Sequence, residues 1–139
     1  MRRFVIDANI AAKWYLPETD SALAERLLEE EAELHAPAFL QIEFASIIWK
    51  HSIAGNVSKD LWRAAGAELR TAIANWHPDA LLLEPALNLA ITHRHHVFDC
   101  LYLALAIQVD GIVVTADKQF LMKFGNSEFS SREIGRAHV

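Results

Sequence analysis

The sequence predicts an α/β domain built on a mainly parallel β-sheet flanked by helices. Short apolar runs that are typical of buried strands alternate with longer helical patterns along the chain. The 139 residues are enough for one domain and too few for two domains that each bury a core. Hydrophobic residues make up 53% of the chain and charged residues 22%, which is the composition of a globular protein. We therefore expect a single domain.

The first half of the chain predicts two strands and four helices, most of them with a recognisable end signal. Pro17 stops the first helix, and Asp20 with Ser21 can cap the second. Gly55 ends a long apolar helix, and Ser58 caps the helix that follows. The strands are expected at residues 3–7 and 34–36, and the helices at residues 10–16, 22–33, 37–54 and 58–75.

The second half predicts two strands and three helices. Leu81-Leu82-Leu83 is a short apolar run that we interpret as a strand, and Pro85 then opens a helix. The β-branched residues 112–114 give the clearest strand signal in the chain. Strands are expected at residues 81–83 and 111–115, and helices at 85–93, 100–109 and 117–124. We assign residues 1–124 to the main domain and residues 125–139 to a C-terminal extension of it, either a short edge strand or disordered.

Composition and charge exclude several classes of protein. The longest apolar run, Cys100 to Ile107, is far shorter than the roughly 20 residues that cross a bilayer. A single cysteine cannot form an intrachain disulfide, and the sequence shows no export signal, so we expect a cytoplasmic location. The net charge of −5 argues against a domain that coats nucleic acid non-specifically.

Glu43 is the first residue that points to chemistry. It lies in the middle of an apolar helix, with Phe39, Leu40 and Ile47 near it on the helical wheel and no basic residue three or four positions away. Burying an unpaired carboxylate is costly, so such a residue needs a cation, a proton or a route to water. We therefore favour a functional role for Glu43 over a solvated surface position.

Three aspartates lie at the ends of predicted elements. Asp7 ends the first strand, Asp99 precedes the apolar helix, and Asp117 follows the strand at 111–115. Taken singly, each is more often a turn residue or a helix cap than a ligand. Asn9 is expected to cap the next helix, or else to orient Asp7 or a metal-bound water. Thr115 is either a strand-end residue or a hydroxyl that supports the site.

The four carboxylates in combination predict a metal site. Open α/β sheets bind their ligands at the carboxyl ends of their strands. If Asp7, Glu43, Asp99 and Asp117 converge there, their like charges raise one another's pKa unless a cation neutralises them. Carboxylate oxygens suit Mg²⁺ or Mn²⁺, which bind through a few carboxylates and keep several waters. Such a site polarises a phosphate and activates a water for in-line attack.

Four segments of the sequence together resemble the PIN domain, and their order and spacing are most similar to the small bacterial toxins of the VapC type. The segments are FVIDAN at residues 4–9, Glu43 in its helix, FDCLYLALA at 98–106 and VTAD at 114–117. The resemblance covers the chain from Phe4 to about Phe124. It implies a Rossmann-like sheet, a Mg²⁺ or Mn²⁺ site, endoribonuclease activity, homodimerisation and inhibition by a cognate antitoxin.

The resemblance also implies roles for individual residues. The residues from 125 onward depart from the family pattern, so it assigns them no role. The family's catalytic and metal-binding acids match Asp7, Glu43, Asp99 and Asp117, and its accessory polar positions match Asn9 and Thr115.

RNA binding must be reconciled with an acidic chain. Removing the four site acids from the 18 leaves 14 acids against 13 bases, so the remaining surface is nearly neutral. The histidines at 93, 95 and 96 lack the second ligand cluster of a zinc site, and we interpret them as a solvated loop near phosphate. Few phosphate contacts are then available, which favours a limited, shape-selected target such as a tRNA loop. The candidate RNA contacts are Lys13, Arg94, His95, His96 and Lys118.

Three alternatives remain open at this point. A phosphoryl-accepting signalling or phosphatase domain also has a strand-end aspartate, although a haloacid-type phosphatase requires an aspartate where this chain has Asn9. A non-catalytic PIN-like RNA-binding module is the second, and the intact acidic quartet argues against it. In the third, His95 and His96 act as an acid–base pair and produce a cyclic phosphate without metal.

Large aromatic side chains are numerous for so small a core. Buried packing is the expected role for most of them. Because aromatic residues are enriched in interface cores, we expect some to line a homodimer contact and an antitoxin groove. The set comprises Trp14, Tyr15, Trp49, Trp62 and Trp76.

Overall fold

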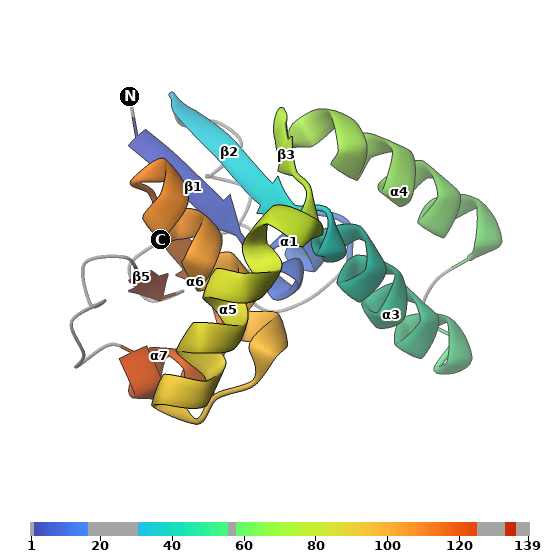
Figure 1. Ribbon diagram of the computed structural model, residues 1–139. Helices are drawn as coiled ribbons and strands as arrows, with labels where there is room; N and C mark the ends of the chain where they lie inside the picture. The colour runs from blue at the N-terminus through green and yellow to red at the C-terminus, as the bar shows by residue number, and fades with distance from the viewer. Residues whose placement is uncertain (1, 17–30, 56–57, 125–132, 136–139) are drawn as a thin grey trace.

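A five-stranded parallel sheet forms the centre of the protein (Figure 1). The computed structural model describes residues 2–16, 31–55, 58–124 and 133–135. Within them the strand order is β3-β2-β1-β4-β5, and every pair of neighbouring strands is parallel. The strands are β1 (Arg2–Ile6), β2 (Ala32–Pro37), β3 (Asn75–His77), β4 (Ile112–Thr115) and β5 (Glu133–Gly135). The predicted α/β class with a mainly parallel sheet is confirmed.

The strand order reverses direction between β1 and β4. The chain passes from β1 to β2 to β3 in one direction and then returns to place β4 on the other side of β1. Right-handed crossovers in opposite directions put their helices on opposite faces of the sheet and leave a crevice at the reversal. The carboxyl ends of β1 and β4 therefore flank the position where an open α/β sheet binds its ligand.

Helices α5 and α6 cover the sheet face that is turned to the viewer in Figure 1. They pack against each other, and α6 also contacts β1, β2 and β4. Helix α1 contacts β4 and α3, and α3 packs beside α4 at one end of the sheet. The helices are α1 (Ala8–Lys13), α3 (Phe39–Ile53), α4 (Lys59–Ala72), α5 (Asp79–His93), α6 (Val97–Val109) and α7 (Lys118–Phe124).

Helix α6 lies at the centre of the core. Every residue from Cys100 to Ala106 is buried, which explains why its sequence is apolar on all sides and not along one stripe. The turn after it is tight, because a Cβ atom on Gly111 would lie 2.8 Å from the carbonyl oxygen of Arg3. None of the described helices is both long and apolar enough to cross a membrane.

Two of the predicted helix-end signals, Gly55 and Ser58, are confirmed. Gly55 follows α3 with a φ of +79°, and the Ser58 hydroxyl accepts a hydrogen bond from the backbone N–H of Leu61 at the start of α4. Helix α3 begins at Phe39 instead of at the predicted residue 37, because β2 extends to Pro37. The side chain of Asp79 supplies the missing cap, since its Oδ1 accepts from the N–H of Phe39 at 2.9 Å.

The predicted strand at residues 81–83 is wrong. The three leucines lie in the first turns of α5, and Pro85 lies inside this helix instead of opening it. Leucine is a strong helix former, and the buried positions Leu82 and Ala86 are four apart, which is a helical spacing. The third strand is instead β3, at residues that the sequence assigns to the end of the preceding helix and the segment after it.

The prediction of a helix over 22–33 lies mostly outside the described residues. Its last three positions are contradicted, because Glu31 lies in a bend and Ala32 and Glu33 belong to β2. In the C-terminal extension, β5 pairs with β4 in parallel, as an edge strand would. The division of the chain at residue 124 stays a prediction.

Candidate functional site

Asp7 lies directly after β1, at the reversal in strand order. Its Oδ1 accepts from the N–H of Ile10 at 2.9 Å and caps α1, and its Oδ2 accepts from the hydroxyl of Thr115 at the end of β4. The side chain is buried, and this burial raises the pKa of Asp7 from its ordinary value of 3.8 to about 7. The charges of Glu43 and Asp99 raise it further, against the two hydrogen bonds, which lower it.

Asp117 is joined to the same end of β4 by a second hydrogen bond. The Thr115 hydroxyl accepts from the backbone N–H of Asp117 at 3.0 Å, so Thr115 links the two aspartates. The Oδ1 atom of Asp117 accepts from the N–H groups of Gln119 and Phe120, at 2.9 and 3.2 Å, and so caps α7. Thr115 therefore hydrogen-bonds to two of the four acids, and its accessory role stays a prediction.

Glu43 projects from the middle of α3 and is half-buried. The phenol of the buried Tyr102 donates a hydrogen bond to Glu43 Oε1 at 2.6 Å. Burial raises the pKa of Glu43, and the charges of Asp99 and Asp117 add to the rise, while the bond from Tyr102 lowers it. The same environment raises the pKa of Tyr102 well above its ordinary range, so the phenol remains a donor.

Asp99 lies in the first turn of α6 and does not precede the helix as predicted. The helix begins at Val97, and His96 occupies the cap position. His95 Nε2 lies 2.7 Å from Asp99 Oδ2. Burial raises the pKa of Asp99, the bond with His95 lowers it, and the charge of Asp117 raises it.

The four predicted acids influence one another electrostatically. The charges of Glu43 and Asp99 act on Asp7, those of Asp99 and Asp117 act on Glu43, and that of Asp117 acts on Asp99. Among the described residues, no three side chains of His, Cys, Asp or Glu lie close enough together to hold a metal ion. The donor set nevertheless fits Mg²⁺ or Mn²⁺, because such ions bind through one or two carboxylates and complete their shell with water and phosphate. The ligand roles of the four acids stay a prediction.

The structure does not support the predicted helix cap at Asn9 or the predicted RNA contact at Lys13. Asp7 caps α1, so the interpretation of Asn9 as the cap is wrong; it lies exposed inside this helix. Lys13 is the last residue of α1 and is only 9% exposed, so little of its side chain can meet RNA.

The other RNA-contact candidates lie near α7 or at its start. Lys118 is exposed and opens α7, and Arg94 and His96 are exposed in the connection between α5 and α6. The solvated-loop interpretation is wrong for His95, whose side chain is only 8% exposed. Its ring packs edge-to-face against Phe120 and another phenylalanine of α7, with ring centroids 5.8 and 5.3 Å apart.

Tyr102 is the site residue that sequence analysis missed. It stands in the apolar run of α6, where an aromatic residue suggests only packing. The available signal was its position three residues after Asp99, which puts both side chains on one face of the helix. A lone hydroxyl on an otherwise apolar helix needs a partner when it is buried, and that partner is Glu43.

Comparison with known proteins places this site in a family. The family model described as the PIN domain matches residues 4–123. The chain belongs to the PIN-domain family. It is 33% identical over 130 residues to Ribonuclease VapC3 of Pyrobaculum aerophilum, covering 88% of this chain and 95% of that protein. It also superposes on the crystal structure of PAE2754 from Pyrobaculum aerophilum with a TM-score of 0.71. That match has 17% identity and covers 91% of this chain and 82% of the other, so it supports the fold alone.

Proposed function

We propose that this PIN-domain protein is a Mg²⁺- or Mn²⁺-dependent endoribonuclease and the toxin of a toxin–antitoxin pair, acting in the cytoplasm. The observation that carries the proposal is the set of raised carboxyl pKa values at the reversal between β1 and β4. Asp7, Glu43 and Asp99 are each pushed towards the protonated form by burial and by their acidic neighbours. Such an arrangement is costly without a cation, and its cost is relieved when one binds. The similarity to Ribonuclease VapC3 supports RNA as the substrate.

Hydrogen bonds orient all four carboxylates, and the N–H groups of Gln119 and Phe120 at the start of α7 hold Asp117. Thr115 and the N-terminus of α1 fix Asp7, Tyr102 fixes Glu43, and His95 fixes Asp99. Groups that orient ligands in this way keep a site ready for its ion. The ion would be held by Asp7, Glu43, Asp99 and Asp117, with Asn9 and Thr115 in accessory roles. When bound, it supplies charge to polarise the scissile phosphate and to lower the pKa of a water molecule.

Cleavage products distinguish this chemistry from its histidine-based rival. Attack by water leaves a 5′-phosphate and a 3′-hydroxyl, whereas an acid–base pair such as His95 and His96 yields a 2′,3′-cyclic phosphate. The test is end-group analysis of products from a tRNA pool incubated with the purified protein in Mg²⁺, in Mn²⁺ or in EDTA. We expect 5′-phosphate ends that form only with metal.

Matched carboxamide variants assign the acids. Glu43→Gln removes a proposed ligand, whereas Glu84→Gln changes an exposed glutamate of α5. Glu43→Gln should abolish cleavage and Glu84→Gln should leave it unchanged. Cyclic phosphate ends that form equally well in EDTA would contradict the carboxylate mechanism, as would full activity of Glu43→Gln.

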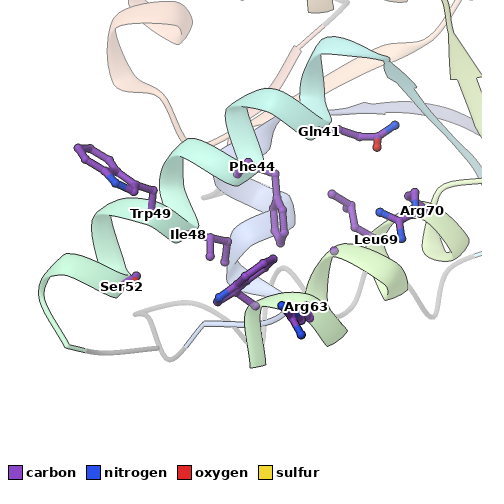
Figure 2. A pocket seen from close by; sticks show the side chains of 11 residues that line it. Gln41, Phe44, Ile48, Trp49, Ser52, Arg63, Leu69 and Arg70 are labelled. Atoms are coloured by element: carbon purple, nitrogen blue, oxygen red, sulfur yellow. The ribbon is translucent and has the colours of Figure 1, made fainter. Parts of the chain in front are cut away.

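A groove between α3 and α4 is the proposed site for the antitoxin. It has a volume of about 680 Å³, and Figure 2 shows Phe44 of α3 and Leu69 of α4 pointing into the space between the helices. Trp49 and Trp62 line it and are 61% and 39% exposed. Because its basic lining residues, Arg63 and Arg70, both lie on α4, the groove fits an apolar segment that carries acidic residues.

The groove can be tested separately from the active site. Trp62→Glu should prevent a co-expressed antitoxin from neutralising the protein and leave cleavage unchanged. Lys59→Glu, on the same helix and outside the groove lining, is the matched control. Neutralisation of Trp62→Glu at the normal antitoxin level would contradict this site. A neighbouring reading frame that encodes a small DNA-binding protein would support the toxin assignment.

We also propose that the protein is a homodimer. Leu83, Leu87 and Ile91 follow one another at four-residue spacing on α5, and they are 59%, 48% and 69% exposed. A second copy of the chain would cover such a stripe. Sedimentation should give a dimer for the natural protein and a monomer for Leu87→Glu, and a strictly monomeric natural protein at high concentration would contradict the proposal. Among the large aromatic residues, Trp14 is buried in the core, which is the role expected for most of them.

A further inference from the structure

A cavity of about 700 Å³ lies between α7 and the connection that joins α5 to α6. Its lining carries two cations, Arg94 from the connection and Lys123 from α7, together with the rings of His95 and His96. Gln119 stands four residues before Lys123, so α7 turns one face towards the cavity. The described residues that line it include no acid. This cavity is called the Arg94–Lys123 pocket below.

The pocket adjoins the carboxylates through a single side chain. The ring of His95 lines the pocket, and its Nε2 lies 2.7 Å from Asp99 Oδ2. Phe120 of α7 packs edge-to-face against the same ring, with ring centroids 5.8 Å apart. The basic pocket and the acidic site are therefore held at a fixed separation by one buried ring.

Arg94 adopts a left-handed backbone conformation, which glycine adopts more easily than arginine. It ends α5 with a φ of 54° and a ψ of 50°, the left-handed region that glycine or asparagine usually occupies after a helix. Its side chain is exposed and lines the pocket. An arginine at this position brings a guanidinium, with several N–H donors, to the pocket's edge.

The negative charge of the proposed catalytic site opposes RNA binding, and a basic pocket beside it would counteract this effect. RNA carries a negative phosphate at every nucleotide, and the four acids repel all phosphates that a metal ion does not neutralise. The cations of the pocket, which adjoins Asp99 through His95, can offset this repulsion for the phosphate of a neighbouring nucleotide. We infer that the Arg94–Lys123 pocket binds an RNA phosphate next to the scissile one, an inference that rests on the proposed ribonuclease function.

Lys123 provides the cleanest test, because it belongs to the pocket and has no contact with the acids among the interactions described above. Lys123→Ala is compared with Lys59→Ala, an exposed lysine at the start of α4. Both changes are made in an Asp7→Asn background, and fluorescence anisotropy measures the Kd for a short labelled oligoribonucleotide in Mg²⁺. The same two lysine variants are assayed for cleavage with Asp7 intact.

Loss of one phosphate contact has a defined signature. We expect Lys123→Ala to raise Kd by about three- to fivefold, and Arg94→Ala with Lys123→Ala to raise it roughly tenfold. The slope of log K against log salt should fall in magnitude by about 0.7 for the single variant. In cleavage, KM should rise while kcat stays unchanged, and Lys59→Ala should match the unchanged protein throughout.

The outcomes separate the pocket from the proposed function. Equal Kd values and salt slopes for Lys123→Ala and Lys59→Ala would overturn the pocket, even if the natural protein cleaves RNA with metal. Weaker RNA binding by Lys123→Ala, with unchanged binding by Lys59→Ala, would support the pocket, even if the natural protein shows no metal-dependent cleavage. A fall in kcat with unchanged KM would also overturn it, because the lysine would then act on the chemical step and not on binding.

Discussion

Replacing Asp7 with asparagine should stabilise the protein when no metal is present. Burial raises the pKa of Asp7 from 3.8 to about 7. Between these two pH values the carboxyl is mostly protonated in the folded state and mostly ionised in the unfolded chain. The free energy of unfolding therefore falls as the pH rises from about 4 to 7. Each pKa unit is worth about 1.4 kcal/mol, so the carboxylate costs the folded state about 4 kcal/mol above pH 7.

Asparagine removes this cost and keeps most of the local structure. Its Oδ1 can still accept from the N–H of Ile10, and asparagine caps helices as well as aspartate does. Its amide can donate to the Thr115 hydroxyl, which now donates to Asp7. We expect Asp7→Asn to raise Tm by roughly 12 °C at pH 8, and this gain should shrink steadily towards pH 4.

Thermal and urea unfolding between pH 4 and 8, in EDTA, provide the measurement. Asp60→Asn, an exposed aspartate in the first turn of α4, is the control and should change nothing. Mg²⁺ should then stabilise the natural protein more than Asp7→Asn, since the ion offsets the cost of a buried carboxylate that asparagine does not carry. An Asp7→Asn protein less stable than the natural one at pH 8 would refute this reasoning, and Asp7 would be a structural cap.

Three further substitutions test contacts of the site and of the fold. Tyr102→Phe removes the donor to Glu43 and should lower cleavage about ten- to 100-fold, while the circular dichroism spectrum stays unchanged. Full activity of this variant would exclude a positioning role for Tyr102. Gly111→Ala forces a Cβ atom against the Arg3 carbonyl and should cost about 1–3 kcal/mol in urea unfolding, whereas no cost would mean that the turn relaxes. Asp79→Ala removes the cap of α3 and should cost about 1 kcal/mol by the same assay; an unchanged midpoint would mean that solvent replaces the cap.

The parts of the fold that the sequence predicted well have strong local signals. The β-branched run of β4 and the serine cap of α4 each depend on residues that are neighbours along the chain. The leucines at 81–83 misled the prediction because a short apolar run fits a buried strand and a buried helix equally well. Their helical periodicity emerges only when Ala86 is added, beyond Pro85, a residue that by itself predicts the start of a helix.

Contacts between distant residues could not be predicted from one sequence. Asp79 caps a helix that begins 40 positions earlier, and Tyr102 meets a glutamate 59 positions away. In the sheet, Nδ1 of His35 in β2 lies 2.9 Å from Nε2 of His77 in β3, 42 positions away. Nothing in the local pattern of these residues names the partner, because sheet order and helix packing decide which side chains meet.

The position of α6 links the stability of the core to the geometry of the site. Asp99 and Tyr102 stand three residues apart on this helix, so one face provides a site carboxylate and the donor that holds Glu43. The next residues, from Leu103 to Ala106, are all buried, and close packing around them resists a shift of the helix. The apolar run of α6, whose sequence suggests only core packing, thus supports two residues of the candidate site. The geometry of this site depends on the packing around the helix.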